Sequence, residues 1–148
     1  MIRDLLDKVF KKTIRIICSV LPEYKTPGAA GFDLSILDDY ILQPNELHNF
    51  HTGVRVDIPK NHCLLVFPRS SLGQRKVIIP NSAGVIDSDY RGEIKVPLLN
   101  LSDDYIEFKS GQRVAQCLLV QVKQAKLEKV ERLSETVRGL GGFGSTGI

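Results

Sequence analysis

The chain has 148 residues, which is long enough for one domain with a hydrophobic core and too short for two comfortable ones. Its formal net charge is +3, and its 20 lysines and arginines are spread along the sequence, so neither nucleic acid nor a membrane is indicated as a partner. No apolar run approaches the about 18 residues that span a bilayer, and Asp4 and Asp7 interrupt the apolar stretch at the N-terminus. We therefore expect a cytoplasmic protein without a signal peptide.

Residues 1–12, MIRDLLDKVFKK, carry apolar side chains at spacings of three and four. This period predicts a short amphipathic helix that packs as an appendage. A helix that binds a membrane surface or a partner protein is the alternative, and the two aspartates and the short length argue against it.

Residues 13–137 form a series of short β-rich segments separated by turn-forming Pro, Gly, Asn, Asp and Ser. Many short strands at such spacing predict an all-β domain, with a jelly-roll-like arrangement favoured over other barrels or sandwiches. The segments expected to form strands are 13–20, 32–37, 49–58, 63–68, 93–101, 114–122 and 125–131. Two of them, which contain PLLNL and CLLVQV, are too continuously apolar for a sheet with one wet face, and this suggests contacts between subunits.

The cysteines Cys18, Cys63 and Cys117 lie in apolar segments and show no C-x-x-C spacing. We expect reduced core thiols rather than a disulfide or a metal site. The three histidines form no H-E-x-x-H motif and no group with cysteine, so a protein-bound zinc ion is not predicted.

The C-terminal segment RGLGGFGSTGI, residues 138–148, contains the spacing G-x-G-x-x-G at Gly139, Gly141 and Gly144. A dinucleotide-binding loop needs a helix after the glycines, and the sequence leaves no room for one. A Walker loop fails as well, because Ser145 stands where its lysine belongs. By composition alone, the segment is a frayed end.

Four further segments carry side chains that packing explains poorly. TPGAAGFDL places small residues before Asp33, so another group can approach the backbone closely there. PRSSL places Arg69 beside two hydroxyls at a strand end, which suits phosphate oxygens. NSAGVIDSDYRGEI is expected to form a hairpin that carries Asn81, Asp87 and Tyr90, and GQRVAQ begins a strand.

Taken singly, these residues have simple structural explanations. Asn81 and the aspartates suit turns, Tyr90 suits half-buried packing, and Arg91 suits a surface ion pair. Together they supply an amide for a base edge, an aromatic ring for stacking, donors for phosphates and a carboxylate that activates water. The combination suits a nucleoside polyphosphate.

In order along the chain, AGFDL, PRSSL, NSAGVIDSDYRGEI, GQRVAQ and RGLGGFGSTG resemble the five motifs of the trimeric deoxyuridine triphosphate nucleotidohydrolases, the dUTPases. The resemblance runs from about Tyr24 to Gly147. It implies a distorted jelly-roll or β-clip barrel over residues 13–137, a homotrimer with active sites shared between subunits, and a flexible lid over residues 138–148. It also implies hydrolysis of dUTP to dUMP and pyrophosphate with Mg2+, which limits uracil incorporation into DNA and supplies dUMP for dTMP synthesis.

The resemblance also implies individual roles. Asp87 would activate the water that attacks the α-phosphorus, and Tyr90 would pack under the deoxyribose and exclude a 2′-hydroxyl. Phe143 would stack on the uracil. No direct protein ligand to Mg2+ is expected, and Asp33 is a candidate for its outer shell. The substrate-binding residues implied in this way are Arg69, Ser70, Ser71, Asn81, Gly84, Val85, Ile86, Tyr90, Gln116, Arg138, Phe143, Gly144, Ser145 and Thr146.

Two positions depart from the family pattern. Ser71 stands where the family usually has glycine, which costs strain if φ is positive there. Gln112 stands where an acidic residue is common, and this concerns the turn more than the chemistry.

Two other functions stay open. The related dCTP deaminases share the fold and the trimer, but they need a glutamate base and typically lack the Phe-Gly-Ser-Thr tail. Glu93 is the only glutamate in the hairpin segment. The second alternative is a binding or regulatory protein that keeps the nucleotide pocket as a switch, and the presence of Asp87 and of the whole tail argues against it.

Overall fold

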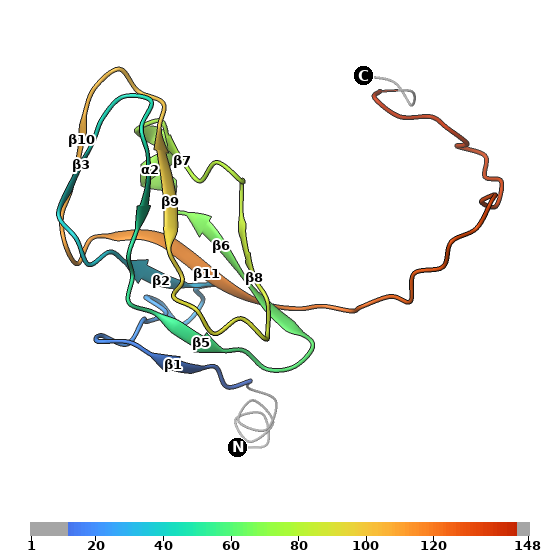
Figure 1. The fold of residues 1–148 in the computed structure, drawn as a ribbon, viewed down its shortest axis with the longest axis horizontal. Coiled ribbons are helices and arrows are strands. Elements are labelled where there is room, and N and C mark those ends of the chain that lie inside the picture. The colour runs from blue at the N-terminus through green and yellow to red at the C-terminus, as the bar shows by residue number, and fades with distance from the viewer. Residues whose placement is uncertain (1–11, 145–148) are drawn as a thin grey trace.

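The computed structural model describes residues 12–144 of the chain (Figure 1). Apart from Lys12, the helix expected over residues 1–12 lies outside the described residues, and so do Ser145 and Thr146. In the described part, no helix has the length and the apolar composition that a membrane span requires.

The regular secondary structure of the described chain is almost entirely β-strand, which confirms the all-β fold that the sequence predicts. Its largest sheet has four antiparallel strands in the order β2-β11-β6-β8. These strands are β2 (Phe32–Ser35), β6 (His62–Pro68), β8 (Gly84–Ile86) and β11 (Arg113–Gln121). Strand β6 therefore pairs with β11 on one edge and with β8 on the other.

Three smaller antiparallel sheets complete the fold, with strand orders β4-β9-β7, β1-β5 and β10-β3. Their strands are β1 (Arg15–Ile17), β3 (Tyr40–Leu42), β4 (Leu47–Phe50), β5 (Arg55–Asp57), β7 (Val77–Ile78), β9 (Val96–Asn100) and β10 (Ile106–Phe108). The short helix α2 (Ser70–Gln74) follows β6 and buries Leu72.

The strands alternate buried and partly exposed side chains, as expected for sheets with one face on a core. In β9, Val96, Leu98 and Asn100 are fully buried, whereas Pro97 and Leu99 are not. Burial of each large apolar side chain contributes about 1.5–3 kcal/mol to folding. The largest fully buried side chains come from all parts of the barrel: Leu34, Ile36, Leu42, Phe50, Leu64, Leu72, Val77, Ile94, Val96, Leu98, Phe108 and Val114.

The buried amide of Asn100 ties the end of β9 to β3. Its Nδ2 donates to the main-chain carbonyls of Leu42, Gln43 and Asp104 at 2.8–3.2 Å. Its Oδ1 accepts hydrogen bonds from the N–H and the hydroxyl of Ser102. The side chain is therefore fully hydrogen-bonded, and its burial costs little.

The cysteines lie as the sequence predicts. Cys63 and Cys117 are buried free thiols, and Cys18 is partly buried against the core. Burial raises the pKa of the Cys117 thiol to about 12, so this group stays protonated at neutral pH.

Several predicted strand boundaries are wrong. The segment 49–58 divides into β4 and β5 because Gly53 adopts a left-handed φ of 67° between them. The strand predicted over residues 125–131 is absent, because no other strand of the described chain lies beside it. Strands β3, β7 and β10 and helix α2 were not predicted, because elements of so few residues show too little periodicity. The hairpin expected over residues 81–94 is wrong as a strand pair: β8 pairs with β6, whereas β9 pairs with β4 and β7.

Residues 122–144 leave the barrel after β11 and extend away from it (Figure 1). Within the described chain, the hydrogen bonds of residues 123–144 join members of this same segment, as between Arg138 and Gly141. Its apolar side chains are largely exposed, including Leu127, Leu133, Val137, Leu140 and Phe143. Exposed apolar side chains on an extended segment suit packing on a surface other than their own barrel.

Candidate functional site

The loop that joins β8 to β9 lines an open depression of about 730 Å³. Six residues that the sequence predicts for catalysis or substrate binding lie together in it: Asn81, Gly84, Val85, Ile86, Asp87 and Tyr90. The remaining lining residues are Asn49, Arg55, Glu93, Ile94, Lys95 and Pro97. A single chain therefore assembles this first group without help from another.

Strand β8 and the turn before it place Asp87. Gly84 pairs with Val66 of β6, and a Cβ at position 84 would lie only 3.3 Å from the Val66 Cβ, so a small residue fits best. Ser82 adopts a φ of 66°, a conformation that is costly for a residue other than glycine. Asp87 follows directly after β8 and so stands at the start of the next turn.

Hydrogen bonds fix that turn. The N–H of Tyr90 donates to the Asp87 carbonyl at 3.1 Å. Arg91 Nη1 donates to the carbonyls of Ser88 and Tyr90 at 2.7 and 3.1 Å, and Nη2 donates to Asp57 Oδ1 at 2.8 Å. Arg91 thus pairs with an aspartate of β5 rather than with its sequence neighbours, and it cross-links the turn to that strand.

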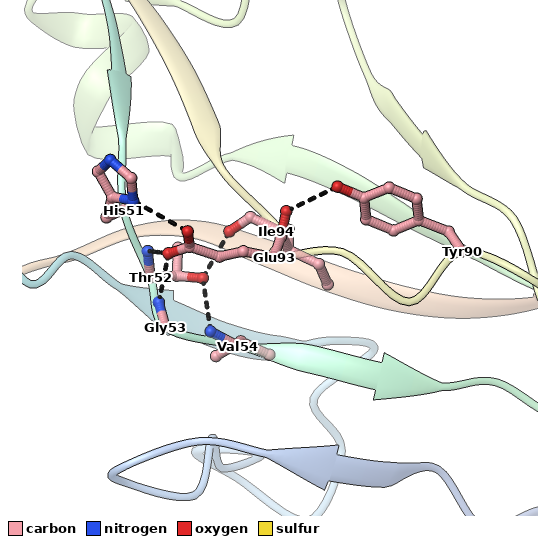
Figure 2. A network of polar contacts seen from close by, with 7 residues as sticks. All are labelled: His51, Thr52, Gly53, Val54, Tyr90, Glu93 and Ile94. Atoms are coloured by element: carbon pink, nitrogen blue, oxygen red, sulfur yellow. Dashed lines mark hydrogen bonds and ion pairs between the residues drawn. The ribbon is translucent and has the colours of Figure 1, made fainter.

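Glu93 is a site residue whose contacts sequence reasoning missed (Figure 2). Its carboxylate accepts hydrogen bonds from the main-chain N–H groups of Thr52 and Gly53 and lies 2.9 Å from His51 Nδ1. Burial alone would raise the pKa of Glu93, but the hydrogen bonds from Gly53, His51 and Thr52 hold it below its usual value. The carboxylate is therefore ionised near neutral pH.

A second group of site residues lies where β2, β11 and β6 run side by side. Asp33 is the register partner of Gln116. Its Oδ2 accepts a hydrogen bond from Arg113 Nη1 at 2.7 Å, and its Oδ1 lies 3.7 Å from Arg69 Nε. The Asp33 side chain is only 14% exposed, so it orients two guanidinium groups that are more accessible than itself. Arg113, to which the sequence assigned no role, also lines a cavity of about 390 Å³ with Asp33.

The structure places the two residues that depart from the family pattern, Ser71 in α2 and Gln112 in the turn before β11. Arg69 precedes the helix in an extended conformation, and Ser70 and Ser71 form its first turn. Ser71 is not among the described residues with positive φ, so the expected strain is absent. Gln112 Oε1 accepts a hydrogen bond from the Lys109 N–H at 3.2 Å, which agrees with a role in the turn.

The small residues of AGFDL are approached closely by the chain's own backbone. A Cβ at Gly31 would lie 2.7 Å from the Cys117 carbonyl oxygen and 2.9 Å from Leu118 Cδ1. This contact lets β2 lie tightly against β11 and so brings Asp33 beside Gln116. The sequence predicted a close approach at this position, and the approaching group is β11.

A third group lies on the extended C-terminal segment. Phe143 is fully exposed, and both Phe143 and Gly144 have positive φ. Arg138 donates from Nε to the Gly141 carbonyl at 3.0 Å. The cavities of about 730 and 390 Å³ contain none of these residues. Within the described part of one chain, the first group thus lines the depression of about 730 Å³, Asp33 lines the cavity of about 390 Å³, and the third group lies on the C-terminal segment outside both.

The comparisons with known proteins agree on one family. The family model described as dUTPase matches residues 19–147. The deoxyuridine 5′-triphosphate nucleotidohydrolase of Nautilia profundicola is 45% identical over 130 residues, which cover 87% of this chain and 92% of that protein. The enzyme of the same name from Zymomonas mobilis is 45% identical over 128 residues, covering 86% and 88%.

Solved structures show the same fold. The dUTPase of Staphylococcus bacteriophage 80alpha with dUPNHPP superposes with a TM-score of 0.85, covering 93% of this chain and 100% of that one at 24% identity. The dUTPase from Streptococcus mutans superposes with a TM-score of 0.71, covering 78% and 99% at 27% identity.

The contact at Gly31 generates a prediction. Gly31→Ala should lower the free energy of unfolding by roughly 1–3 kcal/mol, because the new methyl group would displace β2 from the backbone of β11. Gly28→Ala is the matched control, since no heavy atom lies within 4 Å of its added Cβ, and it should be neutral or slightly stabilising. Urea unfolding followed by far-UV circular dichroism measures both, and equal stabilities would contradict the packing described here.

Proposed function

The chain belongs to the dUTPase family, and on that premise we propose that it hydrolyses dUTP to dUMP and pyrophosphate. The observation that carries the proposal is the single depression shared by Asn81, Asp87 and Tyr90. These side chains supply an amide for a base edge, a carboxylate for a water and a ring for a sugar, which are the groups that this reaction needs.

Asp87 is the proposed general base. It stands at the start of a turn that is cross-linked by Arg91, so its backbone is held in place, and it lines the depression. A carboxylate there can accept a proton from one water as that water attacks the α-phosphorus. No covalent intermediate is needed.

The segment 81–90 is assigned the recognition of the nucleoside. Asn81 and the main chain from Gly84 to Ile86 would read the donors and acceptors of uracil, and a close fit would exclude a 5-methyl group. The ring of Tyr90 would pack under the deoxyribose and leave no space for a 2′-hydroxyl.

The second group is assigned to the phosphates. Arg69, Ser70 and Gln116 would bind the phosphate chain, with Ser70 near the bridge between the α and β phosphates. Asp33 already accepts a hydrogen bond from Arg113 and faces Arg69, which fits an outer-shell position toward metal-bound water better than direct ligation of Mg2+. The metal, when bound, neutralises phosphate charge.

We further propose that the complete site forms between subunits of a homotrimer. The first group and Asp33 line different cavities, the third group lines neither, and the segment 122–144 extends away from its own barrel (Figure 1). About ten extended residues reach roughly 35 Å, far enough for the lid 138–148 to cross to a neighbouring subunit. There Phe143 would stack on the uracil, and Arg138, Ser145 and Thr146 would close over the phosphates.

The deaminase alternative is weakened by the contacts of Glu93. A general base must present its carboxylate to the substrate, whereas this one accepts hydrogen bonds from two main-chain N–H groups and faces His51.

A substrate panel tests the proposal. The protein is incubated with Mg2+ and, separately, with dUTP, dCTP, dTTP and UTP, and nucleotide products, pyrophosphate and ammonia are quantified. We expect dUMP and pyrophosphate from dUTP alone, because the segment 81–90 would exclude the other nucleotides. Ammonia from dCTP would support the deaminase instead, and binding without turnover would support a regulatory switch.

The role of Asp87 is tested by Asp87→Asn. The amide keeps the size of the side chain but cannot accept the proton, so turnover should fall by about 100-fold or more while nucleotide affinity is retained. Single-turnover kinetics and equilibrium binding separate the two effects. Near-normal turnover would exclude Asp87 as the base.

Shared sites are tested by complementation. Deleting residues 138–148 should abolish most activity, as should Asp87→Asn. If the lid and Asp87 of one site come from different subunits, trimers reassembled from equal amounts of the two variants should regain about a quarter of wild-type activity. The subunit that supplies Asp87 carries an intact Asp87 in half of the sites, and the subunit that supplies the lid carries an intact lid in half of those. Light scattering checks that both variants and the mixture are trimeric. A mixture as inactive as its components would mean that each subunit supplies its own lid.

A further inference from the structure

Glu93 and Ile94, which lie just before β9, make five direct contacts with the turn between β4 and β5. Figure 2 shows the contacts of the Glu93 carboxylate and of the Thr52 hydroxyl. Three involve the Glu93 carboxylate: the N–H of Thr52 at 3.1 Å, the N–H of Gly53 at 2.8 Å and His51 Nδ1 at 2.9 Å. The other two join Ile94 to this turn, through the Thr52 hydroxyl at 2.5 Å and the Val54 carbonyl at 2.8 Å.

Within residues 12–144, the N–H groups of Thr52 and Gly53 donate to no acceptor other than this carboxylate. Gly53 has a φ of 67°, and this turn presents the N–H groups of residues 52 and 53 to the same acceptor, Glu93 Oε1. The Glu93 side chain is 19% exposed, so loss of the acceptor would leave these N–H groups poorly solvated. An ionised carboxylate only accepts hydrogen bonds, so His51 Nδ1 carries the proton of their contact.

The same residue controls the position of the Tyr90 ring. The Tyr90 hydroxyl donates to the main-chain carbonyl of Glu93 at 3.0 Å. Between them stands Gly92, where an added Cβ would overlap the Tyr90 hydroxyl and ring. The ring therefore lies directly over the backbone of residue 92, and its far end is held by residue 93.

We propose that Glu93 is a positioning residue that sets discrimination between deoxyribose and ribose, because it fixes the carbonyl to which the Tyr90 hydroxyl is bonded. This inference rests on the proposed function, in which the Tyr90 ring lies under the sugar. Hydrogen bonds of the described chain connect the turn 51–54 to the Glu93 carboxylate, and another connects the Glu93 main-chain carbonyl to the Tyr90 hydroxyl.

The link is intact at the pH at which the enzyme would be assayed. Because the pKa of Glu93 is lowered in the folded state, the stability that it contributes is complete above the ordinary glutamate pKa of about 4.3 and is lost only as the pH falls through the lower folded value. His51 contacts the carboxylate directly, and the ionisable groups that line the depression with Glu93 are Arg55, Asp87, Tyr90 and Lys95.

The test compares kcat/KM for dUTP and UTP in wild type, Glu93→Ala and Glu93→Gln. Glu93→Ala should lower the dUTP-to-UTP ratio by about 10-fold, because residue 93 and the tyrosine ring lose their anchor. Glu93→Gln should retain most of the ratio, since its amide oxygen can accept both main-chain N–H groups and His51 can change tautomer. Should Glu93→Ala not fold, Glu93→Asp replaces it, because the shorter carboxylate cannot keep all three contacts.

Glu46→Ala is the matched control for general loss of stability. Glu46 is also a turn carboxylate, which accepts from the Gln43 N–H and from the Tyr40 hydroxyl, but it lies outside the depression. It should leave the dUTP-to-UTP ratio unchanged. Tyr90→Phe should lower the ratio, and adding Glu93→Ala to it should cause little further loss, because both changes break one link.

The outcomes separate this inference from the function on which it rests. A wild-type protein that does not hydrolyse dUTP would reject both. A wild-type enzyme that is active and selective, with an unchanged ratio in folded Glu93→Ala or Glu93→Asp, would reject only the inference. Equal losses in the Glu46 and Glu93 variants, or additive losses in the double variant, would also overturn it.

Discussion

Backbone pairing on the two edges of β6 sets the geometry of both barrel-borne groups of site residues. On one edge β11 places Gln116 opposite Phe67, and on the other β8 places Gly84 opposite Val66. Because side chains alternate between the faces of a strand, a slip of one residue in either pairing would turn the whole set to the other face. The packed core beneath β6 prevents such slips. Burial of apolar side chains therefore fixes the positions of the site residues that these strands carry.

Polar contacts over long sequence distances then position the individual side chains. Arg113 with Asp33, Arg91 with Asp57 and His51 with Glu93 join residues 80, 34 and 42 positions apart. Of the three, the Arg91–Asp57 pair is the most exposed, and exposed ion pairs contribute little to the free energy of folding. These contacts orient side chains. The backbone of each residue is already fixed by the sheets, and the contact limits the directions in which its side chain can point.

The sequence predicted the fold class, because strands and turns leave local patterns. It also predicted that Asn81, Asp87 and Tyr90 lie together, because they belong to one short segment, but this segment is not the expected hairpin, since β8 pairs with β6. The sequence did not predict the long-range contacts that orient these side chains. Neither the contact of Glu93 with the turn at Gly53 nor that of Asp33 with Arg113 produces any periodicity, since the partners are distant in sequence. The strand expected over residues 125–131 has a suitable composition, but a strand also needs a neighbour, which composition does not supply.

The overlap between Gly92 and the Tyr90 ring makes substitutions at these two positions depend on each other. A side chain at position 92 is tolerated only after the ring has been removed or turned away, whereas a smaller residue at position 90 needs no prior change. The order of mutational steps is thus constrained, and the pair is epistatic for a purely steric reason. A lineage that replaced Tyr90 with a smaller residue would allow a side chain at position 92, and tyrosine could then return to position 90 only after that side chain had been lost.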